Sequence, residues 1–200
     1  NKKRSMAEND HKAEKENEMK PTTYAKLSKF VGKPSSNLDC SVTEFTENKI
    51  FEYATNKCIA YRIIQDNYTE AKEIKIFNNL RGQIKNTSYP NLNRIFDANF
   101  DNKGNCDDIS RLLKDFMLAN SMSEKDFNFM LNEKKFLLNT KTVKPALDFV
   151  KTLMNDKTEF NFNDSNLKLE YNSELKPLRF TFSCINDLIV QVLITPMRKR

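Results

Sequence analysis

The stretch of sequence that decides the fold lies in the last third of the chain, residues 134–197. It reads KKFLLNT (134–140), KTVKPALDFVKTLM (141–154), TEFNFND (158–164), NLKLEYN (166–172) and LKPLRFTFSCINDLIVQVLITP (175–196). The second segment carries apolar residues at helical spacing, whereas the others alternate apolar and polar residues or form short apolar runs, as strands do. Residues 134–197 therefore predict a βαβββ unit of an α+β fold.

The helix expected near residues 142–154 has two different faces. Lys141, Lys144 and Lys151 lie on one side of the helical wheel, and Pro145 is expected in the first turn, where its missing N–H costs little. The other side is apolar and consists of Val143, Ala146, Leu147, Val150, Leu153 and Met154. Such lysines either face solvent, which is the commoner arrangement, or contact the phosphates of a nucleic acid.

A weaker version of the same unit occupies residues 21–65. Tyr24, Leu27 and Val31 form one apolar stripe of a helix that Gly32 and Pro34 end. Three lysines repeat this spacing two residues later, about 200° around the helix, and so lie on its opposite face: Lys26, Lys29 and Lys33. Three strands are expected after the helix: CSVTEFT (40–46), KIFEYAT (49–55) and CIAYRIIQ (58–65).

The middle of the chain, residues 66–125, is less regular and is interpreted as an insertion between the two units. EIKIFNNL (73–80) fits a strand or a short helix, and residues 89–106 are expected to form a loop. Asp107 and Asp108 offer an N-cap for an amphipathic helix that buries Ile109, Leu112 and Phe116. Residues 1–20 are polar and predict a disordered arm or linker, whereas residues 198–200 begin a tail.

Composition excludes several classes of function. The single histidine, His11, lies in the polar arm, and none of the four cysteines belongs to a C-x-x-C pair. The sequence therefore predicts no catalytic triad, no Cys/His metal site and no cofactor, although a nuclease that binds metal through carboxylates alone stays open. The net charge of +6 mildly favours a polyanionic partner. The longest apolar run, near residues 188–194, is too short to span a bilayer.

Residues 128–197 resemble the closing half of a PCNA-fold domain. They are most similar to the Rad nine-type subunit of the nine-one-one checkpoint clamp. The resemblance rests on an acidic and aromatic approach (SEKDFNFML, 123–131), a strand and a helix, a strand that begins KPLRFTF (176–182) and a closing strand LIVQVLITP (188–196). Residues 21–65 fit the opening half of such a domain loosely. The expected fold is thus a single PCNA-like α+β domain over residues 21–197, with two βαβββ halves.

The resemblance implies a non-enzymatic, nuclear subunit of a heterotrimeric ring that encircles double-stranded DNA in damage signalling and repair. Its expected partners are two other clamp subunits, a clamp loader and an activator of a checkpoint kinase. The helices that line the channel in this family correspond to those carrying Lys26, Lys29, Lys33, Lys141, Lys144 and Lys151. The strand at 58–65, in which Ile59, Tyr61 and Ile63 alternate, corresponds to the edge that pairs with a neighbouring subunit, or else is an ordinary core strand.

Two departures from the family keep other functions open. A full clamp subunit has two such domains, whereas these 200 residues hold one, and the linker that binds client peptides is not recognisable. One alternative is another PCNA-fold processivity factor, homomeric or monomeric. A second is a protein-interaction domain without a nucleic-acid role, whose exposed edge strand captures a peptide.

Overall fold

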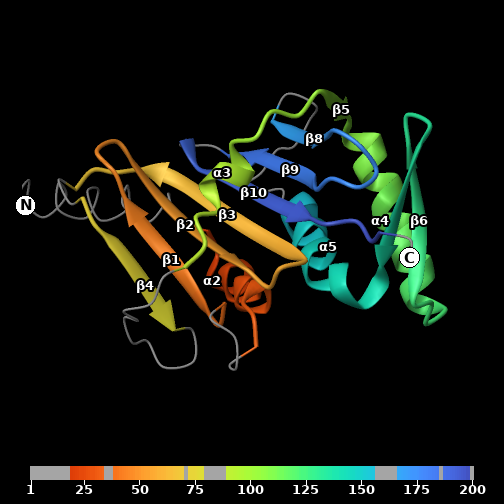
Figure 1. The fold of residues 1–200 in the computed structure, drawn as a ribbon, viewed down its shortest axis with the longest axis horizontal. Helices are drawn as coiled ribbons and strands as arrows, with labels where there is room; N and C mark the ends of the chain where they lie inside the picture. The colour runs from red at the N-terminus through yellow and green to blue at the C-terminus, as the bar shows by residue number, and fades with distance from the viewer. Residues whose placement is uncertain are drawn as a thin grey trace, which may run out of the picture.

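The computed structural model describes residues 19–33, 38–69, 72–78, 89–155, 166–184 and 187–198, which form one eight-stranded antiparallel sheet covered on one face by helices (Figure 1). A separate two-stranded hairpin lies beside the helices. The elements in chain order are α2 (Pro21–Tyr24), η2 (Ala25–Phe30), β1 (Cys40–Phe45), β2 (Lys49–Thr55), β3 (Ile59–Asp66), β4 (Ile74–Asn78), α3 (Asn93–Phe96), β5 (Asn102–Gly104), α4 (Cys106–Ser121), β6 (Asp126–Leu131), β7 (Lys134–Asn139), α5 (Thr140–Asn155), β8 (Leu167–Tyr171), β9 (Leu178–Ser183) and β10 (Ile189–Ile194).

Most of the elements expected from the sequence are present. The closing unit is β7–α5–β8–β9–β10, and the opening unit contains the helical segment α2–η2 followed by β1, β2 and β3. Residues 73–80, which fitted either a strand or a helix, contain strand β4. The stretch TEFNFND (158–164) and most of the polar arm, residues 1–18, lie outside the described residues.

The large sheet joins two similar halves through their last strands. Its order is β4-β1-β2-β3-β10-β9-β8-β5, so the meander β1–β3 and the meander β8–β10 meet where β3 pairs with β10. The register runs from Ile59 opposite Ile194 to Ile64 opposite Ile189. The strand at 58–65 is therefore not an edge strand: β3 has β2 on one side and β10 on the other. Its backbone groups are occupied within this chain, which corrects the expectation that this strand pairs with a neighbouring subunit.

The main hydrophobic core lies between the sheet and the helices. Ile59, Tyr61 and Ile63 point toward the helices and are buried there together with alternate residues of β8, β9 and β10. The ring of Phe30 from η2 packs edge-on against Tyr61 at 5.4 Å and against Phe149 of α5 at 5.7 Å, measured between ring centroids. Burial of each such side chain stabilises the fold by roughly 1.5–3 kcal/mol. Ile59, Tyr61 and Ile63 thus belong to the core, which was the alternative interpretation of this strand.

The opposite face of the sheet is crossed by the segment that contains α3 (Figure 1). Arg62 of β3 is buried, and its guanidinium donates to Gln191 at 2.9 Å and to the carboxylate of Asp97 at 2.6 Å. It also lies over the ring of Phe96 at 4.9 Å. The segment at 89–100, expected to be a loop within an insertion, is therefore fixed on the sheet, because a buried guanidinium needs these partners.

A second arginine holds the far end of the same segment. Arg179 of β9 pairs with Glu170 at 2.9 Å, donates to the carbonyls of Phe96 and Ala98, and stacks on the ring of Phe100 at 4.1 Å. The two arginines come from different halves of the sheet. The segment therefore bridges the junction of β3 with β10 on its outer side.

Helix α4 begins at Cys106, two or three residues earlier than an N-cap at Asp107 or Asp108 would place it, and Asn105 is its cap. The side chain of Asn105 accepts from the backbone N–H of Asp108 at 2.9 Å, and the Asp108 carboxylate accepts from the Asn105 N–H at 2.9 Å. This reciprocal pair is a capping box with asparagine at the N-cap and aspartate three residues later. Asp107 and Asp108 lie in the first turn, where their negative charge interacts favourably with the positive end of the helix dipole.

We expect Asn105→Ala to lower the free energy of unfolding by about 1 kcal/mol, because the N-cap acceptor of α4 is removed. The measurement is urea denaturation followed by far-ultraviolet circular dichroism. Asn120→Ala is the matched control, since Asn120 is exposed near the other end of the same helix. Equal midpoints for the two variants would contradict the role of Asn105.

The β6–β7 hairpin was not expected as a separate sheet. Its turn residues Asn132 and Glu133 both have positive φ, 46° and 65°, as a two-residue hairpin turn of type I′ requires. Phe129 of β6 and Phe136 of β7 are fully buried beneath the hairpin. The chain end returns to this hairpin, where the N–H of Met197 donates to the Leu137 carbonyl at 2.8 Å. Within the described ranges, no helix is long and apolar enough to cross a bilayer.

Candidate nucleic-acid interface

The structure brings the two lysine-bearing helical segments, one from each half of the chain, into contact. On the helix-covered side of the sheet, η2 lies against α5, and Phe30 and Phe149 pack between them and the sheet. The Lys26 ammonium of η2 donates to the Thr152 hydroxyl of α5 at 2.5 Å. Lysines separated by more than a hundred residues in sequence therefore share one layer of the molecule.

The first segment differs from the expected helix in its winding. After one α-helical turn, Ala25–Phe30 forms a 3₁₀ helix, in which residues three apart lie above one another. Phe30 consequently takes the buried position beside Leu27 that was expected for Val31, and the helix ends at Phe30. Lys29 is exposed, Lys26 is half-buried against α5, and Lys33 is exposed but lies beyond the helix. Pro34 lies outside the described residues.

All three expected lysines of α5 are exposed, but an acidic residue lies among them. The Lys144 ammonium pairs with Asp148 at 3.1 Å and lies 5.8 Å from the ring centroid of Phe116 in α4. The Lys151 ammonium is 3.3 Å from the sulfur of Met117, also in α4. Asp148 is one turn after Lys144, so it partly neutralises the lysine stripe. Sequence reasoning did not register this carboxylate.

Helix α5 begins at Thr140, two residues earlier than expected. The Asn139 side chain accepts from the Thr142 N–H at 2.9 Å and so caps the first turn. Pro145 consequently lies in the second turn rather than the first, inside the helix. Its missing N–H leaves the Lys141 carbonyl without the usual helical donor.

Helix α4 adds a cation that the sequence reasoning missed. Lys114 is exposed and lies opposite the buried stripe of Ile109, Leu112 and Phe116, a pattern that would have identified it. Arg111 is engaged elsewhere: its guanidinium donates to Asp108 at 2.8 Å and to the Met130 carbonyl at 3.0 Å.

The three helical segments differ in charge. The segment 21–30 has two lysines and no acid, α5 has three lysines and one aspartate, and α4 has one lysine and one arginine against three aspartates. Cations spread over a helix surface contact phosphates without reading bases. Among the residues that the structure describes, no group of three or more His, Cys, Asp or Glu side chains is placed to hold a metal ion. The layer thus fits weak, sequence-independent contact with a polyanion.

Comparisons of sequence find nothing: no protein-family model and no curated protein matches this chain. Comparison of structure, in contrast, finds similar solved proteins. The beta chain of DNA polymerase III from Streptococcus pneumoniae superposes with a TM-score of 0.63 at 10% identity, covering 89% of this chain and 62% of that one. The fold is that of a sliding clamp. The clamp fold confirms the PCNA-like α+β class expected from the sequence.

Other solved clamps are similar to the same extent. The Helicobacter pylori beta clamp bound to a DNA ligase peptide has a TM-score of 0.60 at 13% identity, covering 88% of this chain and 62% of that one. The beta subunit of DNA polymerase III from Thermotoga maritima has a TM-score of 0.60 at 11% identity, with coverages of 89% and 63%. The chain thus spans somewhat less than two thirds of the clamps that it matches, and the likeness establishes the fold alone.

Proposed function

We propose that this chain is a non-enzymatic subunit of a ring that encircles double-stranded DNA. The observation that carries the proposal is the clamp fold together with the lysines of η2 and α5 on the outward side of one helix layer. In such a ring the sheet forms the outer wall and the helices face the channel. Lys29, Lys141, Lys144 and Lys151 would then contact phosphates, with Lys114 as an additional cation.

The mechanism would be topological rather than catalytic. Retention on DNA comes from ring closure, and each lysine adds a weak contact that salt screens. Because phosphate contacts carry no sequence information, such a ring slides along the duplex. The binding described for a neighbour, a DNA ligase peptide on the Helicobacter pylori clamp, supports including client proteins in this proposal.

The finer proposal is a heterotrimeric checkpoint clamp that acts in the nucleus with two other subunits, a clamp loader and a kinase activator. It is supported by the resemblance of residues 128–197, in particular the KPLRFTF sequence at 176–182 that leads into and forms most of β9. The alternative is a processivity factor that self-associates or acts alone on DNA. That alternative is favoured by the structural neighbours, which are beta chains of a DNA polymerase.

Light scattering with mixtures of subunits separates these assemblies. The chain is measured alone and then with the two other checkpoint-clamp subunits of the same organism. Conversion of a monomer to a 1:1:1 complex supports the checkpoint ring, whereas self-association supports the processivity factor. Encirclement itself is tested by loading the assembly onto a nicked circular plasmid. A ring is retained at high salt and released when the plasmid is linearised, and release from both forms alike would contradict encirclement.

Asp148→Asn tests the phosphate-contacting layer by a change that should strengthen DNA binding, whereas removal of a lysine should weaken it. Removing the carboxylate that pairs with Lys144 leaves the stripe of α5 with lysines only. We expect the affinity of the assembled ring for a fluorescent duplex to rise by about threefold at low salt, an effect that fades as salt screens it. Glu174→Gln, which removes an exposed acid in the loop before β9, is the control and should change nothing. Unchanged or lower affinity in Asp148→Asn would argue against contact at α5.

A further inference from the structure

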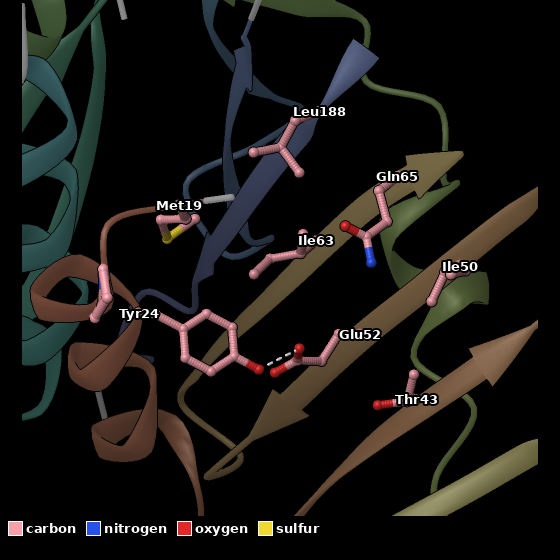
Figure 2. A pocket seen from close by; sticks show the side chains of 9 residues that line it. Met19, Tyr24, Thr43, Ile50, Glu52, Ile63, Gln65 and Leu188 are labelled. Atoms are coloured by element: carbon pink, nitrogen blue, oxygen red, sulfur yellow. Dashed lines mark hydrogen bonds between the residues drawn. The ribbon is translucent and has the colours of Figure 1, made fainter. Parts of the chain in front are cut away.

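A pocket of about 390 Å³ lies on the helix-covered side of the sheet, between the start of α2 and the strands β1, β2 and β3 (Figure 2). Its apolar lining includes Met19, Ile50, Ile63 and Leu188. The carboxylate of Glu52 lies among these side chains in the view of Figure 2. Glu52 is half-buried and is the one acidic side chain among the described residues that line the pocket.

The strand pattern places Glu52 on the face where the sheet is otherwise packed by apolar residues. On β2 it lies opposite Thr43 of β1 on one side and opposite Ile63 of β3 on the other. In β2 the residue two positions later, Ala54, is part of the buried core. The other face of β2 is packed as well, because Phe51 and Tyr53 belong to the second hydrophobic cluster beneath the α3 segment. Glu52 therefore places a carboxylate in a strand whose neighbouring side chains are mostly apolar, at the lining of a pocket.

Two tyrosines hold the carboxylate in place. The Tyr24 hydroxyl donates to Oε2 of Glu52 at 2.5 Å, and the Tyr61 hydroxyl donates to Oε1 at 2.7 Å. Burial raises the pKa of both tyrosines, and the nearby charge of Glu52 raises it further, so both remain donors at neutral pH. Each carboxylate oxygen accepts one hydrogen bond from tyrosine and keeps a second acceptor position.

The charge of Glu52 has no counterpart in the described part of the chain. Within that part, no lysine or arginine lies within 4 Å of its carboxylate. Lys26, the nearest lysine along α2–η2, is turned to Thr152, and Arg62 points to the opposite face of the sheet. The described part of the pocket therefore combines mainly apolar walls, with Thr43 and Gln65 among them, and one carboxylate that no described lysine or arginine pairs with.

We propose that this pocket binds a lysine side chain of a partner protein. The four-carbon stem would lie against Met19, Ile63 and Leu188, and the ammonium would donate to the acceptor positions of Glu52 left free by the tyrosines. An ammonium fits better than a guanidinium, because a compact ammonium needs only one free acceptor position, whereas a guanidinium fork must align with both oxygens at once while the two tyrosines keep their hydrogen bonds. The site uses none of the lysines of the helix layer.

The test is methyl NMR on the 200-residue chain at constant ionic strength. The probe is N-acetyl-lysine methylamide, and N-acetyl-norleucine methylamide is the matched ligand without an ammonium. We expect saturable shifts of the Ile50, Ile63 and Leu188 methyls with millimolar affinity for the lysine probe, as its size allows. The norleucine probe should bind about tenfold more weakly. The Ile109 methyl, buried on the inner face of α4, should not respond to either ligand.

Two variants separate loss of charge from loss of structure. Glu52→Gln should abolish the preference for lysine over norleucine, whereas Tyr24→Phe should retain it, since that change frees an acceptor position on Glu52. Equal shifts by both probes in the unmodified protein would overturn the proposal, as would a lysine preference that survives in Glu52→Gln. If Glu52→Gln does not fold, the two probes are compared on the unmodified protein and on Tyr24→Phe. That comparison still shows whether the pocket prefers lysine over norleucine.

Discussion

Arg62→Ala is expected to lower the free energy of unfolding by about 2–3 kcal/mol, or the melting temperature by about 4–12 °C. Arg62 is 3% exposed, and its guanidinium donates hydrogen bonds to the side chains of Gln191, Asn93 and Asp97. Its removal leaves the buried amide of Gln191 without its donor and takes away the cation that lies over the Phe96 ring. The expected loss of stability is at the low end of that caused by breaking a buried ion pair, because the Asp97 side chain is largely exposed.

The measurement is urea denaturation combined with amide hydrogen exchange. Exchange should accelerate in residues 89–100, because Arg62 holds this segment on the sheet, while the core of α5 stays protected until global unfolding. Arg94→Ala is the matched control, since Arg94 lies in the same segment but is exposed. If both arginine variants unfold at the same midpoint, the segment is not held by Arg62.

The double reversal Lys144→Glu/Lys151→Glu is expected to weaken DNA association of the assembled ring by at least about tenfold near 0.1 M salt. The plot of log affinity against log salt should also become less steep by about two, one unit for each lysine that no longer neutralises a phosphate. Both lysines are exposed on α5, and the reversal removes the i,i+4 pair of Lys144 with Asp148 together with the exposed contacts of the two ammoniums with Phe116 and Met117 of α4. That pair contributes about 0.3–0.5 kcal/mol, so the domain stays folded.

Equilibrium binding to a fluorescent duplex over a series of salt concentrations checks this result. Lys57→Glu/Lys168→Glu is the control with the same change in net charge, because these exposed lysines lie in the β2–β3 turn and on β8, outside the helix layer. Equal weakening by both double variants would indicate an effect of overall charge rather than of the α5 stripe. A collapse of stability in the α5 variant would show that these lysines belong to the packing of the domain.

The local elements of the closing half were predictable because each has one buried face. In β9, Leu178, Phe180 and Phe182 are buried and alternate with partly exposed residues, which is the signature of a strand packed on one side. In α5 the apolar residues recur at helical spacing, and five of the six expected on the inner side are buried. Met154 is only partly buried, and Phe149, which was not expected there, is buried as well. The 3₁₀ winding of η2 was not predictable, because its lysine spacing of three fits both helix types.

The candidate site was predictable only in part. Exposed lysines opposite an apolar stripe are visible in the sequence, and the structure places Lys141, Lys144 and Lys151 accordingly. The sequence contains no local sign that η2 lies against α5, that Asp148 pairs with Lys144, or that Tyr24 and Tyr61 converge on Glu52. These contacts depend on how the elements pack and on the rotamers of the side chains. The periodicity of apolar residues in the sequence does not encode either.

The sequence by itself determined the α+β class, the two strand meanders and the helices that cover them, because hydrophobic periodicity reports which face of each element is buried. Only the tertiary structure decided that β3 pairs with β10, so that Ile59, Tyr61 and Ile63 lie in the core rather than at an edge. An inner strand and an edge strand with one buried face show the same alternation. Their difference lies in backbone hydrogen bonds to a strand more than a hundred residues away, which side-chain pattern does not specify.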